Sequence, residues 1–254
     1  MNRGLVNLEL LRKNRNKADF EGKSAYCFIY DDKLIKIYAR KCDRDFEYPI
    51  DVNKVCDLSK FSADTIVFPI EYIYEDDKKV GEILPYINSK SIDVSFDGKA
   101  SIQTIISGYE EVLSDLELYN NIDMIDLCCV NVLYSNKDGF HLIDTTEWQI
   151  KDNSMKMNVL RFNSSLIGVM VDNLTIPVIY NKYYSNIDKT FYKRMAKYGN
   201  AGIRLQKNMN LLMNGRYCFL DLMFAYMDVY RIHYGKDAKT LEDIKEMTKV
   251  LKKG

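Results

Sequence analysis

The chain has 254 residues, which is enough for one large domain or for two lobes that each bury a hydrophobic core. Lys and Arg together number 36, as do Asp and Glu, so the formal net charge at pH 7 is zero. This balance excludes an overall field that would recruit nucleic acid or an anionic membrane surface.

The sequence also lacks the patterns of secreted, membrane-spanning and zinc-binding proteins. Residues 1–17 are too charged for the apolar part of a signal peptide, and no apolar run reaches the length of a membrane span. The six cysteines show no C-x-x-C spacing, and the adjacent Cys128 and Cys129 do not suit a disulfide framework. His141 and His233 are too few for a zinc site to be expected. We therefore expect a soluble, cytoplasmic protein.

Two strands joined by a tight turn are predicted near the N-terminus. Residues 21–30 form a turn that leads into a strand, and residues 34–38 form the next strand after an Asp-Asp-Lys turn. Lys36 lies between Ile35 and Ile37, so its side chain points to the opposite face of the strand. Such a lysine either reaches solvent or takes part in a binding site, and the strand pattern alone favours neither possibility.

A second pair of strands and a long helix follow. Strands are predicted at residues 65–74 and 80–87, and a boundary between two lobes is expected at residues 88–90. Residues 101–119 carry apolar side chains at a period near 3.6, which predicts a helix with one buried face. Further helices are predicted at residues 164–180, 187–197, 203–213, 217–234 and 241–251.

The segment from residue 123 to residue 148 contains the residues that best indicate a function. Two short apolar runs, at residues 130–134 and 140–143, flank a polar stretch that ends in glycine, so a β-hairpin is predicted. The hairpin would bring Asn131 close to Asp144, and Asp126 on the preceding loop would face the same point. Carboxylate and amide oxygens that converge in this way suit Mg²⁺, which completes its shell with phosphate and water. An ordinary hairpin, whose Asp and Asn residues simply form turns, is the alternative.

This spacing resembles the catalytic core of the protein-kinase-like superfamily. There a catalytic aspartate begins D-L-x-x-x-N, and a β-hairpin and D-F-G follow. Asp126-Leu127 and Asn131 match the first motif, and Asp144 matches the start of the second. Met124-Ile125 replaces His-Arg, and Thr145-Thr146 replaces Phe-Gly. The run Asp-Thr-Thr-Glu-Trp-Gln is similar to the D-x-D-S-W-Q variant of bacterial kinase-like proteins.

The resemblance implies an α+β fold with two lobes. Residues 1–87 would form a β-rich N-lobe, and residues 88–254 a mainly helical C-lobe. ATP and Mg²⁺ would be the cofactors. Catalytic roles fall to Asp126 and Lys36, metal binding to Asn131 and Asp144, and nucleotide binding to Gly22, Ser24, Lys36, Glu47, Leu84 and Tyr86. Glu47 would pair with Lys36, with Asp51 as the second candidate, and Trp148 would lie near the mouth of the nucleotide site.

The acceptor of the phosphoryl group stays open. A divergent bacterial serine/threonine kinase is one reading, with an unknown hydroxyl-bearing acceptor and with neither nucleic acid nor membrane as a partner. No A-P-E-like triplet follows Trp148, which favours a small-molecule kinase similar to the aminoglycoside kinases. A pseudokinase scaffold that binds nucleotide without transferring phosphate is the third reading. Cys128 and Cys129 are interpreted as packing residues.

Overall fold

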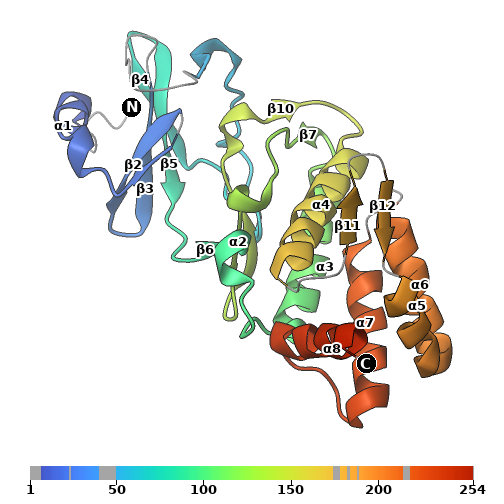
Figure 1. Cartoon of the computed structure of the whole chain (residues 1–254). Coiled ribbons are helices and arrows are strands. Elements are labelled where there is room, and N and C mark those ends of the chain that lie inside the picture. The colour runs from blue at the N-terminus through green and yellow to red at the C-terminus, as the bar shows by residue number, and fades with distance from the viewer. Residues whose placement is uncertain are drawn as a thin grey trace. The chain divides into compact units, whose positions relative to one another are not determined.

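A computed structural model gives the protein a mixed α and β architecture with a small antiparallel sheet (Figure 1). The structure describes residues 7–22, 24–39, 50–173, 178–181, 184–187, 189–213 and 218–253. The chain divides into two compact units. Unit 1 comprises the described residues of Met1–Ala63, Val67–Asn88 and Thr145–Gln149, and unit 2 those of Asp64–Ile66, Ser89–Asp144 and Ile150–Gly254.

Unit 1 is built on a five-stranded antiparallel sheet in the order β1-β2-β3-β5-β4. The predicted N-terminal hairpin is confirmed, because β2 and β3 pair from end to end around a turn in which Asp31 has a φ of 55°. The elements of the unit are α1 (Leu8–Lys13), β1 (Phe20–Glu21), β2 (Ala25–Tyr30), β3 (Lys33–Tyr38), β4 (Glu71–Glu75) and β5 (Lys78–Pro85), with 3₁₀ turns at Arg15–Lys17, Val52–Lys54 and Thr145–Glu147.

The core of unit 1 lies on one face of this sheet. Alternate residues of a strand point to the same face, and the strand register brings such residues of neighbouring strands together. Leu8 and Leu11 of α1 pack against the cluster that results. Its buried members are Tyr26, Ile35, Ile37, Ile73 and Ile83.

The strand predicted at residues 65–74 is wrong in its first half. Ile66 forms an isolated bridge to Leu142, and regular pairing begins at Glu71. The apolar residues Val67 and Phe68 are buried without belonging to a strand. Burial of an apolar run in an irregular segment leaves the same sequence pattern as a buried strand.

Unit 2 contains the predicted hairpin and most of the helices. In the hairpin, Val132 pairs with Leu142 and Ser135 with Gly139, so its existence and register are confirmed. The strands are β6 (Lys90–Ser91), β7 (Ile122–Asp123), β8 (Val132–Ser135), β9 (Gly139–Leu142), β10 (Gln149–Ile150), β11 (Val178–Asn181) and β12 (Tyr184–Ile187). They form small sheets with the orders β6-β8-β9, β10-β7 and β11-β12.

The long helix α3 (Ile102–Leu118) lies within the predicted range 101–119. Ser101 caps it, because the Ser101 hydroxyl accepts a hydrogen bond from the Thr104 N–H. Gly108 allows the helix to approach the hairpin, since a Cβ at this position would lie 3.1 Å from the ring of Phe140. Helix α3 thus packs directly against the hairpin.

The helix predicted at residues 164–180 is wrong at both ends. Helix α4 runs over Met155–Asn173, and residues 178–181 form β11 instead. The first turns of α4 look like a polar loop in the sequence because they carry Asn158 and Arg161. These polar side chains turn inward and bind backbone groups of unit 2, so polarity at these positions does not mean exposure.

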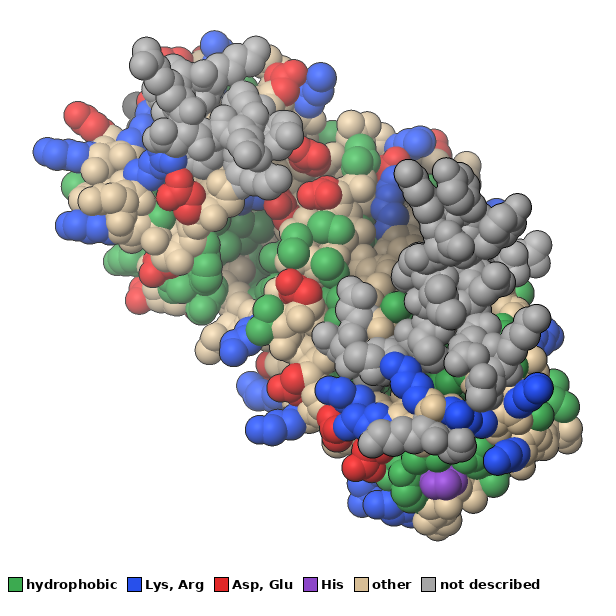
Figure 2. All heavy atoms as spheres, in the orientation of Figure 1, with side chains coloured by type: hydrophobic (Ala, Val, Ile, Leu, Met, Phe, Trp, Pro, Cys, Tyr) green, Lys and Arg blue, Asp and Glu red, His purple; other side chains and the backbone are tan. Residues whose placement is uncertain are grey.

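The remaining helices are α2 (Ile92–Ser95), α5 (Lys189–Met195), α6 (Gly199–Met213), α7 (Phe219–Tyr234) and α8 (Leu241–Lys253). None of the described helices combines the length and apolar character that a membrane span requires. In the view of Figure 2, acidic and basic side chains are interspersed, and basic side chains gather over the C-terminal helices. Along α5, α6 and the 3₁₀ turn between them, the exposed basic residues are Lys193, Lys197, Arg204 and Lys207.

Candidate functional site

Lys36 is buried in the middle of β3, with 8% of its surface exposed. The strand register places it opposite Glu82 of β5, and Glu82 opposite Tyr72 of β4. Gly81 lets the two strands come together here, because a Cβ on Gly81 would lie 2.4 Å from the Lys36 carbonyl oxygen. A solvent-facing role for Lys36 is therefore excluded, and its ammonium lies beside a buried carboxylate.

A second side chain joins this pair. Lys36 Nζ donates to the Thr146 hydroxyl at 2.6 Å, and that hydroxyl donates to Glu82 Oε1 at 2.9 Å. Lys36 Nζ lies 3.4 Å from the same Glu82 oxygen, and the Glu82 side chain is fully buried. Since a charged group away from water needs a close partner, the three side chains form one cluster, which we call the lysine cluster.

The lysine cluster was only partly visible in the sequence. Glu47, the predicted partner of Lys36, lies outside the described residues. Glu82 was missed, although a single carboxylate inside the apolar run of β5 is a usable signal. Burial raises the pKa of the neighbouring Tyr72 phenol, and the negative charge of Glu82 adds to this effect.

In unit 2, the loop between β7 and β8 brings Asp126 and Asn131 into contact. The side-chain amide of Asn131 donates to the Asp126 carbonyl oxygen at 2.8 Å and to its carboxylate at 3.1 Å. Carbonyl and carboxylate oxygens accept hydrogen bonds but cannot donate them, so the amide nitrogen faces Asp126. The amide oxygen of Asn131, the atom that could bind a metal, therefore points away from Asp126.

Asp144 follows the second strand of the hairpin. The Ile143 N–H donates to the Asn131 carbonyl oxygen at 3.0 Å, so the residue before Asp144 is held next to Asn131. Asp144 has a φ of 65°, in the left-handed region that non-glycine residues seldom adopt. Such backbone strain gathers at functional sites, where the surrounding structure maintains it. The predicted approach of Asn131 and Asp144 through the hairpin is thus present in the backbone.

Helix α4 anchors the loop that precedes Asp126. The Asn158 side chain accepts from the Met124 N–H at 3.0 Å and donates to the Ile122 carbonyl oxygen at 2.6 Å. Arg161 lies 2.5 Å from Asp123 and donates to the Met124 carbonyl oxygen at 3.2 Å. Neither anchor was predicted, because the helix was expected to begin only at residue 164.

The charge of Asp123 depends on this anchoring. Burial alone would raise the pKa of its carboxyl, but hydrogen bonds from Arg161 and from Lys151 outweigh burial and lower the pKa. The carboxylate is therefore held in its charged form beside two cations. This pairing stabilises the start of the loop between β7 and β8, which contains Asp126.

Mg²⁺ is the metal that the sequence predicts for Asp126, Asn131 and Asp144. Two carboxylates and one amide oxygen are hard oxygen ligands of the kind that Mg²⁺ takes from proteins, together with phosphate and water. Within the described ranges no group of three or more His, Cys, Asp or Glu side chains could hold a metal ion, so a site built from these residues alone is not found there. Burial raises the pKa of Cys128, which agrees with a packing role for this cysteine.

The four other residues predicted to contact nucleotide have ordinary backbone roles in unit 1. The Gly22 N–H donates to the Ala25 carbonyl oxygen, and the Ser24 carbonyl oxygen accepts from the Ala39 N–H. Leu84 is buried in β5. The Tyr86 N–H already donates to the Asp32 carbonyl oxygen at 2.8 Å, so it is not available to a bound base.

Trp148 is a core residue of unit 1. It is fully buried and packs edge to face against Phe68, with ring centroids 6.4 Å apart. Trp148 therefore has a packing role, and its predicted position near a nucleotide site stays a prediction.

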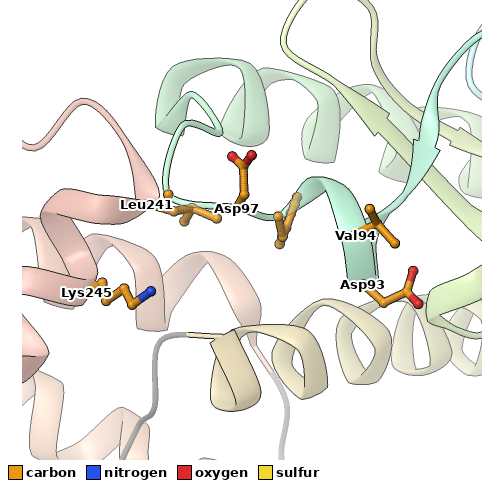
Figure 3. Close-up of a pocket in the computed structure, with 7 residues that line it drawn as sticks. Asp93, Val94, Asp97, Leu241 and Lys245 are labelled. Atoms are coloured by element: carbon orange, nitrogen blue, oxygen red, sulfur yellow. The ribbon is translucent and has the colours of Figure 1, made fainter.

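One cavity, of about 240 Å³, lies elsewhere in unit 2 (Figure 3). Lys245 of α8 borders it on one side, and Asp93 and Val94 of α2 on the other. Its two aspartates are exposed to solvent, and none of the residues predicted for the site lines it. The cavity therefore does not coincide with the predicted chemistry.

Comparison with known proteins adds no assignment. The chain matches no family model, and no curated protein sequence matches it significantly.

Proposed function

We propose that the protein is an ATP-dependent phosphotransferase of the protein-kinase-like type, with residues 1–87 as N-lobe and residues 88–254 as C-lobe. The observation that carries the proposal is the hairpin of unit 2. It holds Asn131 against Asp126 and presents Asp144 in a left-handed conformation. The sequence spacing of these three residues and their backbone geometry support the same role.

Each residue has a definite part in this proposal. Asn131 and Asp144 would hold Mg²⁺, which neutralises phosphate charge when it is bound. Lys36, whose ammonium contacts Thr146 and Glu82, would contact the phosphates of ATP. Positioning and charge neutralisation are the main contributions that proteins make to phosphoryl transfer.

Asp126 would act on the acceptor. Its carboxylate is exposed and oriented by the Asn131 amide, so it could accept the proton of an acceptor hydroxyl. The hydroxyl oxygen forms a bond to the γ-phosphorus as the bond between that phosphorus and the departing ADP oxygen breaks. ATP and a hydroxyl-bearing acceptor are thus the proposed partners, in a cytoplasmic setting.

Thermal unfolding with ATP, with and without Mg²⁺, tests the proposal directly. A ligand that prefers the folded state raises the melting temperature by mass action, so Mg-ATP should raise it more than Mg²⁺ alone. Asp144→Asn should abolish the part of the shift that depends on Mg²⁺. Asn tolerates a positive φ, so this variant keeps the backbone while it removes the charge. No shift at millimolar ATP would contradict the proposed function.

A further inference from the structure

The cavity of Figure 3 lies between two segments that are far apart in the sequence but are bonded to each other. The Leu241 N–H at the start of α8 donates to the Ala100 carbonyl oxygen at 3.0 Å. The next N–H, that of Glu242, donates to the Gly98 carbonyl oxygen at 3.0 Å. Gly98 permits this approach, because a Cβ there would lie 2.4 Å from a Glu242 carboxylate oxygen. The two walls of the cavity are therefore held together by the fold itself.

The apolar part of the lining reaches from the core of unit 2 to the surface. Phe96 and Leu241 are each 1% exposed, and the Phe96 ring packs edge to face against Tyr134, with ring centroids 5.2 Å apart. Val94 of α2 is instead 58% exposed. Val94 thus gives the cavity apolar surface that a ligand could cover, and the buried residues hold that wall in place.

Lys245 is the one cation in the lining of this cavity. It is half-buried on α8, and it forms no ion pair or side-chain hydrogen bond with any residue in the described ranges. Glu242, one turn earlier, is paired with Lys249 at 3.4 Å instead. In Figure 3 the Lys245 side chain extends from α8 toward the space between α8 and α2. A cation that has lost part of its water without gaining a partner favours an anionic group beside it.

Two carboxylates border the same cavity from the other segment. Asp97 is oriented by the chain, because the Lys99 N–H donates to its carboxylate at 2.8 Å. Asp93 of α2 is exposed and has no hydrogen-bond or ion-pair partner in the part of the chain that the structure describes. Asp93 is therefore available to a cationic group of a ligand.

The two signs of charge and the volume decide which ligand fits. A simple amine would leave Lys245 unpaired and would be repelled by it, and a simple carboxylate would be repelled by Asp93 and Asp97. A zwitterion satisfies both sides. The cavity holds about 240 Å³, which is below the ~300–1,000 Å³ of sites for drug-sized ligands, so its ligand is a smaller molecule.

We propose that this cavity binds a free amino acid with an aliphatic side chain. The ligand carboxylate would bind Lys245, its ammonium would bind Asp93, and its side chain would lie against Val94. The cavity belongs entirely to unit 2 and shares no residue with the proposed phosphotransferase site, so the inference does not depend on the proposed function.

Isothermal titration of the full chain with L-leucine and three analogues tests the assignment. Isopentylamine lacks the carboxylate, 4-methylpentanoate lacks the ammonium, and glycine lacks the aliphatic group. L-Leucine should bind with a Kd at least about tenfold lower than that of each analogue, because one charge-assisted hydrogen bond or a few buried methylene groups account for a ratio of this order.

Two variants should change the ligand preference in opposite directions. Lys245→Met keeps an unbranched side chain of good helix propensity and removes the charge. It should bind L-leucine at least about tenfold more weakly, while isopentylamine binds as well as before or better, since the repelling ammonium is gone. Asp93→Asn should also weaken L-leucine but should leave 4-methylpentanoate unchanged or improved. A variant that merely failed to fold would lose every ligand.

Lys252→Met is the control for Lys245→Met. Lys252 is exposed near the end of the same helix and does not line the cavity, so this variant should bind L-leucine like the parent. Binding lost equally in both methionine variants would overturn the role of Lys245.

Three other results would overturn the proposal. One is the absence of saturable binding by the parent with L-leucine at about 10 mM, which would fill most of a site of millimolar Kd. Another is binding of an analogue as tightly as L-leucine. The third is a preference for L-leucine that survives in both Lys245→Met and Asp93→Asn. Stabilisation by Mg-ATP is measured separately, so its absence would count against the proposed function and not against this site.

Discussion

The two adjacent threonines after Asp144 provide a matched pair for testing the lysine cluster. Thr145 and Thr146 are both buried, at 2% and 4% exposure. The Thr146 hydroxyl bonds to Lys36 and to Glu82, whereas the Thr145 hydroxyl has no hydrogen-bond partner in the described part of the chain. Replacing either residue by valine makes the same chemical change in a different environment.

The expected magnitudes follow from these contacts. A hydrogen bond to a charged group contributes roughly 1.5–3 kcal/mol to stability, so two such bonds set an upper limit of about 6 kcal/mol. Part of this is recovered, because Lys36 and Glu82 already lie 3.4 Å apart and can close directly. We expect Thr146→Val to destabilise unit 1 by about 2–4 kcal/mol. Thr145→Val should change stability by less than about 1 kcal/mol in either direction, since no bond is lost.

Urea unfolding followed by tryptophan fluorescence measures the difference. Trp148 is the chain's single tryptophan and is buried in unit 1, so its emission reports this unit. With a denaturant slope of about 2 kcal/mol per molar, the Thr146→Val midpoint should fall by about 1–2 M. The far-ultraviolet circular dichroism signal, which comes mainly from the helices of unit 2, should shift less. Equal fluorescence midpoints for the two valine variants would refute the bonded role of Thr146.

Three further results are expected. Asp126→Ala should retain Mg-ATP binding while phosphoryl transfer falls by about 10²–10⁴, and a rate equal to that of the parent would remove Asp126 from catalysis. Lys36→Ala should weaken both Mg-ATP binding and transfer, which isothermal titration and a labelled-ATP assay would report; unchanged affinity would separate Lys36 from the nucleotide. Burial lowers the pKa of His141 below its ordinary value of 6.5, so the unfolded chain takes up a proton there first, and stability should fall as the pH drops below about 6.5. In His141→Gln this loss should be smaller, and identical pH profiles of urea midpoints would contradict the assignment.

Local patterns predicted the elements that depend on neighbouring residues. The hairpin of unit 2 follows from two apolar runs and a turn that ends at Gly139, where φ is +72°. Helix α3 follows from its apolar period and its serine cap. Both features are encoded over a few residues, so the sequence alone was sufficient.

The partners of buried polar groups depend on tertiary register and were not predictable in the same way. Glu82 faces Lys36 only because β5 pairs with β3 in one particular register, which also requires Gly81 at the point of closest approach. Asn158 and Arg161 look like loop residues because polar side chains are usually exposed. Their burial against the loop before Asp126 becomes visible only when helix α4 is in place.

Residues 145–149 complete unit 1, although the whole stretch Ser89–Asp144 of unit 2 separates them from the rest of unit 1 in the sequence. During synthesis, the strands of the sheet therefore emerge before Thr146 and Trp148 exist. The Lys36–Glu82 pair would then lack its bridging hydroxyl, and Phe68 its aromatic neighbour. Closing so long a loop costs chain entropy and slows folding. All five strands of the sheet are translated earlier, but the lysine cluster and the Phe68–Trp148 contact are completed only when residues 145–149 have left the exit tunnel, so a ribosome-bound N-terminal fragment should be more sensitive to protease before that point than after it.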